Sequence, residues 1–165
     1  MPEYTRHDEG TFSWADLSTT DTDAARRFYS AVFGWELDVQ QIPEEAGGGV
    51  YIVAKRNGKD VCAIQEQRAD QRDAGVPPMW NAYFTVEDVD TKAKEIEANG
   101  GTVHAPPFDV MTAGRMTVAQ DPTGGFFSLW QAKDTIGAYV LAEPNTLRRT
   151  ATPRSRRSPP TAAPS

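Results

Sequence analysis

The sequence predicts an α+β fold in which two βαβββ modules form a curved mixed sheet around a cavity. Three observations support this prediction. Apolar runs typical of strands surround two amphipathic helical stripes, each stripe follows residues that cap helices, and each is followed by glycine. In addition, the second half of the chain repeats the first at a shift of 67 residues, which places Asp21 on Asp88 and Gly34 on Gly101. The coinciding caps and stops indicate two copies of one unit.

The first module begins with a strand-like run over residues 11–17, followed by a segment rich in Ser, Thr and Asp that favours a helix start. The helix is predicted from one apolar stripe at helical spacing, formed by Ala25, Phe28, Tyr29, Val32 and Phe33. Gly34 ends it. Further strands are expected over residues 35–39, 50–54 and 61–64, with Asn57-Gly58 as the hairpin turn between the last two.

The second module follows a charged loop over residues 65–78 and starts with a strand over 80–86. Asp88 caps the next helix, whose stripe contains Val89, Ala93 and Ile96, and Gly100-Gly101 ends it. A short strand over 102–104 and two longer ones over 114–119 and 125–130 complete the module. The segment Asp121-Pro-Thr-Gly is the turn between the last two strands.

We expect one folded unit over residues 10–133, with module one at about 10–67 and module two at about 78–133. Residues 1–9 are polar, and this polarity predicts a flexible arm. Residues 134–165 form an extension, and its last part contains five Pro and five Arg between positions 143 and 165. That composition cannot bury enough apolar surface to offset its ordering entropy, so a disordered basic tail is expected.

The charge of the chain limits its expected partners, and its cysteine content bears on its expected compartment. Residues 1–142 hold 12 basic and 22 acidic residues, a net charge of −10, although the whole chain carries −6. Such an acidic body repels nucleic acid and anionic lipid, so neither nucleic acid nor a membrane is expected as a partner. The single cysteine, Cys62, lies in an apolar strand-like run and is predicted to be a buried structural thiol. With no internal disulfide possible and no apolar signal region, we expect a cytoplasmic protein.

The order of motifs resembles the vicinal oxygen chelate superfamily, the group of glyoxalase, bleomycin-resistance and dioxygenase proteins. The resemblance covers about residues 10–131. In the first half it rests on Trp14-Ala-Asp-Leu, Asp21-x-Asp-Ala-Ala-x-x-Phe-Tyr29 and Phe33-Gly-Trp35. In the second half it rests on Trp80-Asn-Ala-Tyr-Phe-Thr-Val-Glu-Asp88, Asn99-Gly-Gly-Thr-Val, Gly114-Arg115 and Asp121-Pro-Thr-Gly124. It implies paired modules around a cavity, a small-molecule ligand and a homodimer.

The resemblance also implies where metal ligands would stand, namely on the first and last strands of each module. Those positions fall on Trp14, on Ala63 or Gln65, on Asn81 and on Ser128. A catalytic metal needs three or four His or carboxylate ligands, and this set offers none. The chain has two histidines, His7 in the predicted arm and His104 after the second helix. We therefore expect no metal and no cofactor, and neither glyoxalase I nor extradiol dioxygenase activity.

Strand alternation predicts which side chains line the cavity, because every second residue shares a face. The predicted ligand-binding residues are Phe12, Trp14, Trp35, Asn81, Thr85, Phe126, Ser128 and Trp130. An aromatic lining with a few polar groups is typical of small-molecule sites, although the same aromatic residues would also suit an ordinary core. Asp16 and Tyr83 are the candidate catalytic residues. Asp16 could act as a base, or it could pair with Arg115 or cap a backbone group.

Two functions and a third, structural role are consistent with these features. The first is a metal-independent protein that binds and sequesters an aromatic or cationic compound, as antibiotic-resistance members of the family do. The second is a metal-independent enzyme, a lyase, isomerase or hydroxylase-like protein, that acts on a small aromatic or carbonyl compound through Asp16, Asn81 or Tyr83. The third is a dimeric interaction module.

Overall fold

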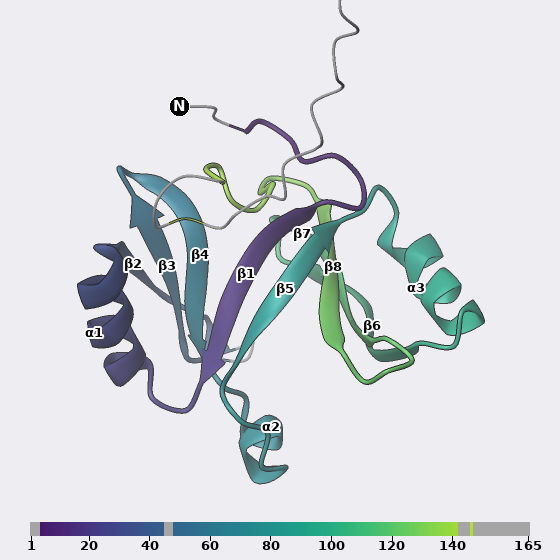
Figure 1. Cartoon of the computed structure of the whole chain (residues 1–165), viewed down its shortest axis with the longest axis horizontal. Coiled ribbons are helices and arrows are strands. Elements are labelled where there is room, and N and C mark those ends of the chain that lie inside the picture. The colour runs from purple at the N-terminus through teal and green to yellow at the C-terminus, as the bar shows by residue number, and fades with distance from the viewer. Residues whose placement is uncertain (1–3, 45–47, 142–145, 147–165) are drawn as a thin grey trace, which may run out of the picture.

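A single eight-stranded sheet organises the chain in the computed structural model, which describes residues 4–44, 48–141 and 146. The strand order is β2-β3-β4-β1-β5-β8-β7-β6. The sheet curves, and helices α1 and α3 stand on its outer side at opposite ends (Figure 1). We call the face covered by these helices the outer face and the opposite one the inner face. The predicted α+β fold with a curved sheet is confirmed.

The elements follow the predicted order. Module one contains β1 (Phe12–Thr19), α1 (Thr22–Phe33), β2 (Glu36–Gln41), β3 (Val50–Arg56) and β4 (Lys59–Glu66). Module two contains β5 (Met79–Thr85), α3 (Val89–Ala98), β6 (Thr102–Val110), β7 (Gly114–Gln120) and β8 (Phe126–Ala132).

Two elements differ from the prediction. The charged loop between the modules contains a short helix, α2 (Ala69–Asp73), whose five residues are too few to show an apolar stripe. Strand β6 runs on to Val110 through Pro106 and Pro107, whereas the sequence suggested that it stops at His104. Strand β6 is an edge strand with register shifts, and an edge tolerates proline because the missing N–H can face away from the sheet.

Strands β1 and β5 pair in antiparallel orientation at the centre of the sheet and join the two modules. Trp14 lies opposite Tyr83, and Asp16 lies opposite Asn81. The neighbouring pairs are parallel, with Asp16 beside Ala63 on β4. In module two, Tyr83 lies beside Ser128 on β8 in the equivalent arrangement. The shift of 67 residues therefore corresponds to an approximate two-fold relation between the modules.

The helices start where the sequence predicted them to start. Asp21 caps α1 by accepting a hydrogen bond from the Ala24 N–H, and Gly34 ends this helix with a φ of 67°. Asp88 caps α3 and accepts from the N–H groups of two residues in its first turn. Each helix packs on an apolar cluster of the outer face. Ala25 of α1 packs on Leu17, Ile52 and Ile64, and Val89 of α3 packs on Val86 and Leu129.

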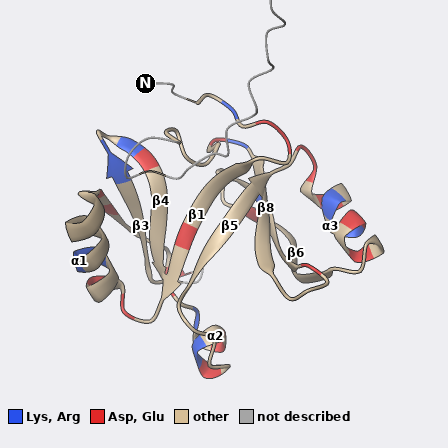
Figure 2. Cartoon of the chain, in the orientation of Figure 1, with Lys and Arg blue, Asp and Glu red and all other residues tan. Residues whose placement is uncertain are grey.

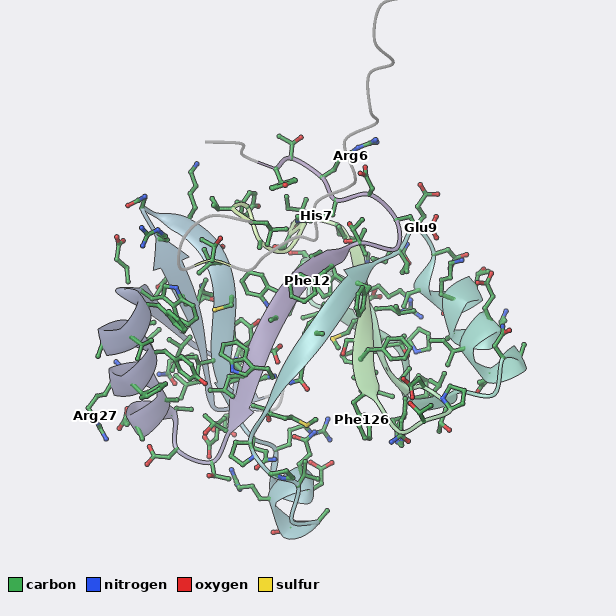
Figure 3. The ribbon with its side chains drawn as sticks, viewed as in Figure 1. Arg6, His7, Glu9, Phe12, Arg27 and Phe126 are labelled. Carbon is green, nitrogen blue, oxygen red and sulfur yellow. The ribbon has the colours of Figure 1, made fainter. Side chains whose placement is uncertain are left out.

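Both terminal segments pack against one end of the sheet. His7 is buried, and its Nε2 lies 2.9 Å from the Ala138 carbonyl oxygen. The Ala138 N–H donates to the Ser13 carbonyl and the Tyr139 N–H to that of Asp60, so residues 138–139 fill the space where β1 and β4 diverge. Within the predicted arm, the Tyr4 N–H also donates to the Tyr139 carbonyl at 3.1 Å. Figure 3 shows His7 beside this end of β1.

The predicted disordered basic tail lies outside the described residues. Within the part of the chain that the structure describes, no helix has the length and apolar character needed to cross a bilayer.

Candidate functional site

A buried carboxylate lies at the centre of the inner face. Asp16 is the acidic residue of β1, visible as the red band on that strand in Figure 2, and its exposed fraction is 2%. Its Oδ1 accepts hydrogen bonds from Gln65 Nε2 at 3.1 Å and Asn81 Nδ2 at 2.7 Å. Its Oδ2 accepts one from the Tyr83 hydroxyl at 2.7 Å. Three neutral donors on β4 and β5 therefore hold this carboxylate in place.

Sheet register explains why these side chains meet. Asn81 lies directly across from Asp16 on β5, and Tyr83 lies two residues further along on the same face. Gln65 on β4 pairs with Ser18, two residues beyond Asp16, and reaches back to it. The sequence also allowed an ion pair between Asp16 and Arg115, and this alternative is wrong. It lies on the outer side and pairs with Asp90 of α3 at 2.8 Å.

Burial shifts the proton equilibria of the whole cluster. Desolvation raises the pKa of Asp16 above its ordinary value, although the hydrogen bonds from Asn81, Tyr83 and Gln65 each act to lower it. Burial, and then the nearby Asp16 charge, raise the pKa of Tyr83 well above its ordinary value. Tyr83 also shares a side-chain hydrogen bond with Ser128, which links Asp16 to β8 through the phenol. Among the described ion pairs none involves Asp16, so no cation offsets its charge.

An aromatic pair flanks the cluster on the module-one side. Trp14 Nε1 donates a hydrogen bond to the Tyr51 hydroxyl at 3.1 Å. Burial raises the pKa of Tyr51, and the Asp16 charge adds to that shift, so the phenol stays protonated. Trp14 was predicted on this face, but Tyr51 was not. The Asn57-Gly58 turn joins these two strands, but a register irregularity between Ala54 and Lys55 separates the turn from the Tyr51–Gln65 pair, so the turn alone does not give this pairing.

Apolar side chains form the opposite wall, on module two. Phe108, Met116 and Trp130 face each other across β6, β7 and β8. The Trp130 ring lies over Gly114, where any Cβ would collide with it, and its Nε1 donates to the Thr135 carbonyl at 2.9 Å. Of these wall residues, only Trp130 was predicted. Alternation along β7 also places Met116 on the inner face, so the signal that could have found Met116 is the same one that found Trp130.

The predicted site residues separate into two groups. Trp14, Asp16, Asn81, Tyr83 and Ser128 come together at the centre of the inner face through the contacts above. Thr85 lies on the same face beside Trp130, and the described structure gives its buried Oγ1 no hydrogen-bond partner. Phe126 lies at the far end of β8, 48% exposed, with its ring 4.9 Å from that of His104.

Two predicted lining residues lie on the outer side instead. A register irregularity between Phe12 and Trp14 turns Phe12 to the face of Phe84, whose ring centroid is 6.1 Å away. One extra residue in a strand reverses the alternation, and this is why the prediction for Phe12 was wrong. Trp35 is buried beneath α1, where it stacks on Tyr29 at 5.9 Å.

The family positions for metal ligands do not fit a divalent metal ion. The parallel registers make Ala63 the equivalent of Ser128, so the four positions hold Trp14, Ala63, Asn81 and Ser128. The Asn81 amide is already directed at Asp16. In the described ranges no group of three His, Cys, Asp or Glu side chains is placed to hold a metal. A divalent cation here would have one carboxylate, whose oxygens are engaged by three donors, where three or four ligands are usual.

Comparison with curated proteins finds relatives about twice as long as the matched region. Putative glyoxylase CFP32 of Mycobacterium tuberculosis and of Mycobacterium bovis is 44% identical over 147 residues, which cover 89% of this chain and 55% of that protein. The anthracycline biosynthesis protein DnrV of Streptomyces peucetius is 33% identical over 153 residues, covering 87% of this chain and 54% of the relative. The chain thus spans about half the length of these curated relatives.

Solved structures share the fold. Methylmalonyl-CoA epimerase of Streptomyces coelicolor, in complex with 2-nitronate-propionyl-CoA, has a TM-score of 0.54 at 20% identity, covering 74% of this chain and 94% of that one. The Mn(II)-bound glyoxalase of Novosphingobium aromaticivorans has a TM-score of 0.53 at 16% identity, covering 88% of this chain and 43% of that one. A profile of the Glyoxalase/Bleomycin resistance protein/Dioxygenase superfamily matches residues 11–129, and the chain belongs to this superfamily.

Proposed function

We propose that the inner face of the sheet binds a small aromatic compound without a metal ion. The observation that carries the proposal is the cluster at the chelating positions, where Asp16 is held by Gln65, Asn81 and Tyr83. This arrangement forms a rigid polar floor, because each of its side chains is fixed by a hydrogen bond to the carboxylate. A small set of fixed polar groups between apolar walls is typical of small-molecule sites.

The two walls support an aromatic ligand. Trp14 and Tyr51 stand on one side of the floor, and the apolar ladder of Phe108, Met116 and Trp130 stands on the other. Flat rings pack well on such side chains. The Asp16 carboxylate, which has no cationic partner among the described residues, favours a ligand with a positively charged or hydrogen-bond-donating group. The relative DnrV carries anthracycline biosynthesis in its name, and anthracyclines are polycyclic aromatic compounds.

Tryptophan fluorescence tests this proposal. Trp14 and Trp130 line the inner face, whereas Trp35 and Trp80 lie near α1. Titration with aromatic compounds should quench the wild-type protein, and Trp130→Phe should lose part of the response. Trp80→Phe is the matched control, because it removes a partly exposed tryptophan from the opposite face. A response that disappears with Trp80→Phe and persists with Trp130→Phe would contradict the proposal.

A second candidate is a metal-independent enzyme in which Asp16 transfers a proton. The raised pKa of Asp16 brings a carboxyl group closer to the range useful for general acid–base catalysis, and Tyr83 connects it to Ser128. The name of the 44% identical relatives, putative glyoxylase, also refers to an enzyme. Asp16→Asn separates the two candidates. Loss of turnover of a bound compound with retained binding favours the enzyme, and absence of any turnover by the wild type favours simple binding.

A further inference from the structure

Each helix leaves a surface hollow between itself and the outer face of the sheet, and the two hollows are equivalent by the internal repeat. The hollow at α1 includes Leu17, Phe28 and Tyr29 and measures about 420 Å³. The hollow at α3 measures about 710 Å³. Its matching residues, found by adding 67, are Phe84, Glu95 and Ile96, and all three line it. The hollow at this place in the fold is therefore larger in module two.

The difference in size follows from side chains that module two lacks. At α1 the rings of Tyr29, Phe33 and Trp35 stack on one another, and Tyr29 accepts a hydrogen bond from Trp80 Nε1 at 3.1 Å. These rings occupy the space between helix and sheet. Positions 96, 100 and 102, equivalent to 29, 33 and 35, hold Ile, Gly and Thr. Helix α3 also ends at Ala98, whereas α1 continues for the two residues that bring in Phe33.

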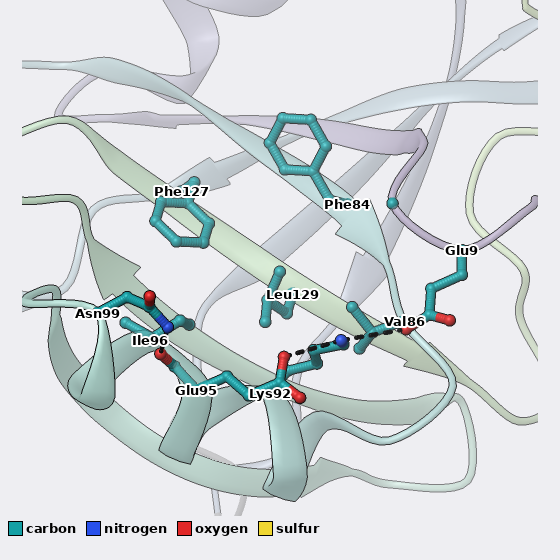
Figure 4. A pocket seen from close by; sticks show the side chains of 10 residues that line it. Glu9, Phe84, Val86, Lys92, Glu95, Ile96, Asn99, Phe127 and Leu129 are labelled. Atoms are coloured by element: carbon teal, nitrogen blue, oxygen red, sulfur yellow. Dashed lines mark hydrogen bonds and ion pairs between the residues drawn. The ribbon is translucent and has the colours of Figure 1, made fainter.

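The hollow at α3 has an apolar floor and a charged rim (Figure 4). Phe84 and Phe127 lie on its floor with ring centroids 6.4 Å apart, in edge-to-face orientation. At the rim Lys92 lies 2.8 Å from Glu95 and 3.6 Å from Glu9. Two carboxylates share one ammonium group, which leaves a net negative charge beside half-buried aromatic rings.

We propose that the α3 hollow is a second ligand site, separate from the inner face, which takes an aromatic ring carrying a primary amine. The ring occupies the space beside Ile96, where module one has the larger Tyr29, and it packs on Phe84 and Phe127. The amine pairs with Glu9 and replaces the Lys92–Glu9 contact, which is the longer of the two ion pairs that Lys92 makes. The acidic body of the protein adds a weak attraction for the same class of compound.

Titration with 1-naphthylmethylamine, followed by ligand-observed NMR and calorimetry on the full chain, tests the proposal. We expect saturable binding about fivefold tighter than that of 1-naphthylacetate, as one exposed charge pair allows. Ile96→Tyr restores the module-one residue, fills the hollow and should weaken binding about tenfold through steric exclusion. Should Ile96→Tyr fail to fold, Glu95→Phe restores the equivalent of Phe28 on an exposed position and should have the same effect.

The matched control is Ala24→Tyr, which places the same bulky side chain in the α1 hollow and should leave binding unchanged. No tryptophan lines the α3 hollow, so this result is independent of tryptophan quenching at the inner face. Absence of saturable binding, or binding that both α3 variants leave intact, would overturn the proposal. It would also be overturned if sedimentation showed a dimer that Glu95→Phe dissociates, because a second copy of the chain would then occupy the hollow.

Discussion

Modules one and two share a backbone plan but differ in how aromatic side chains fill the space between helix and sheet. Module one has Tyr29, Phe33 and Trp35 on the outer face, where they attach α1 to the sheet. Module two has Ile, Gly and Thr at the equivalent positions 96, 100 and 102 and leaves α3 above a larger hollow. The comparison teaches that a duplicated unit can specialise. In module one aromatic rings attach the helix to the outer face, and in module two the larger hollow at the same place is a proposed ligand site.

The largest expected difference between the modules is the loss of stability when Leu17 or its equivalent, Phe84, is replaced by alanine. Leu17→Ala should reduce the free energy of unfolding by about 3 kcal/mol, because Leu17 is only 6% exposed and its loss leaves a cavity in the cluster under α1. Phe84→Ala, at the equivalent position, should cost about 1–2 kcal/mol although it removes a larger side chain, since Phe84 borders an open hollow. Urea denaturation measures both. A greater loss for Phe84→Ala would show that module two is as tightly packed as module one.

A second prediction concerns Asp16 and its equivalent in module two, Tyr83. Burial raises the folded-state pKa of Asp16 above 3.8, so the neutral carboxyl group stabilises the fold at low pH. That stability is fully present below pH 3.8 and is lost as the pH rises through the raised pKa. Asp16→Asn removes the dependence. The variant should therefore gain stability relative to wild type as the pH rises above 3.8, by about 1.4 kcal/mol for each pKa unit of difference.

Chemical denaturation of wild type and Asp16→Asn at several pH values measures this gain. Tyr83→Phe provides the control, because it removes a donor that stabilises the ionised carboxylate and leaves the charge in place. The pH dependence should extend to higher pH in Tyr83→Phe. Parallel stability curves for wild type and Asp16→Asn would contradict the prediction.

Much of the fold was predictable because its signals are local. The caps at Asp21 and Asp88, the stop at Gly34 and the apolar stripes each depend on residues within one turn or strand. The repeat then related the halves without any knowledge of long-range contacts. Helix α2 and the continuation of β6 were missed because a five-residue helix has no periodicity and because proline normally argues against a strand.

The centre of the candidate site was predictable for the same reason, and its periphery was not. Asp16, Asn81 and Tyr83 lie in regular stretches of β1 and β5, where alternation holds. Phe12 departs from it because of a register irregularity, which no local signal marks. The contact of Gln65 with Asp16 depends on the parallel register of β1 and β4, which tertiary packing sets. Alternation along one strand cannot give the offset between two strands.

The smallest expected effect compares the two helix caps. Asp21 accepts one backbone hydrogen bond, from the Ala24 N–H, whereas Asp88 accepts from the N–H groups of Asp90 and Thr91 and from the Thr91 hydroxyl. Replacement by alanine should lower the melting temperature in both cases, and more at Asp88, because more donors in the first turn lose their acceptor.

The pH dependence of this difference gives an independent check. The Thr91 hydroxyl, followed by its N–H, holds the pKa of Asp88 below its ordinary value of 3.8. The stability that this cap contributes is therefore present above that value and is lost as the pH falls through the lowered pKa. The melting temperatures of wild type and Asp88→Ala, measured by circular dichroism, should converge in acid. Asp88→Asn keeps a side-chain acceptor and should lose less at neutral pH. An equal loss in Asp88→Ala and Asp88→Asn would show that the negative charge at the start of α3, rather than the number of hydrogen bonds, sets the difference between the two modules.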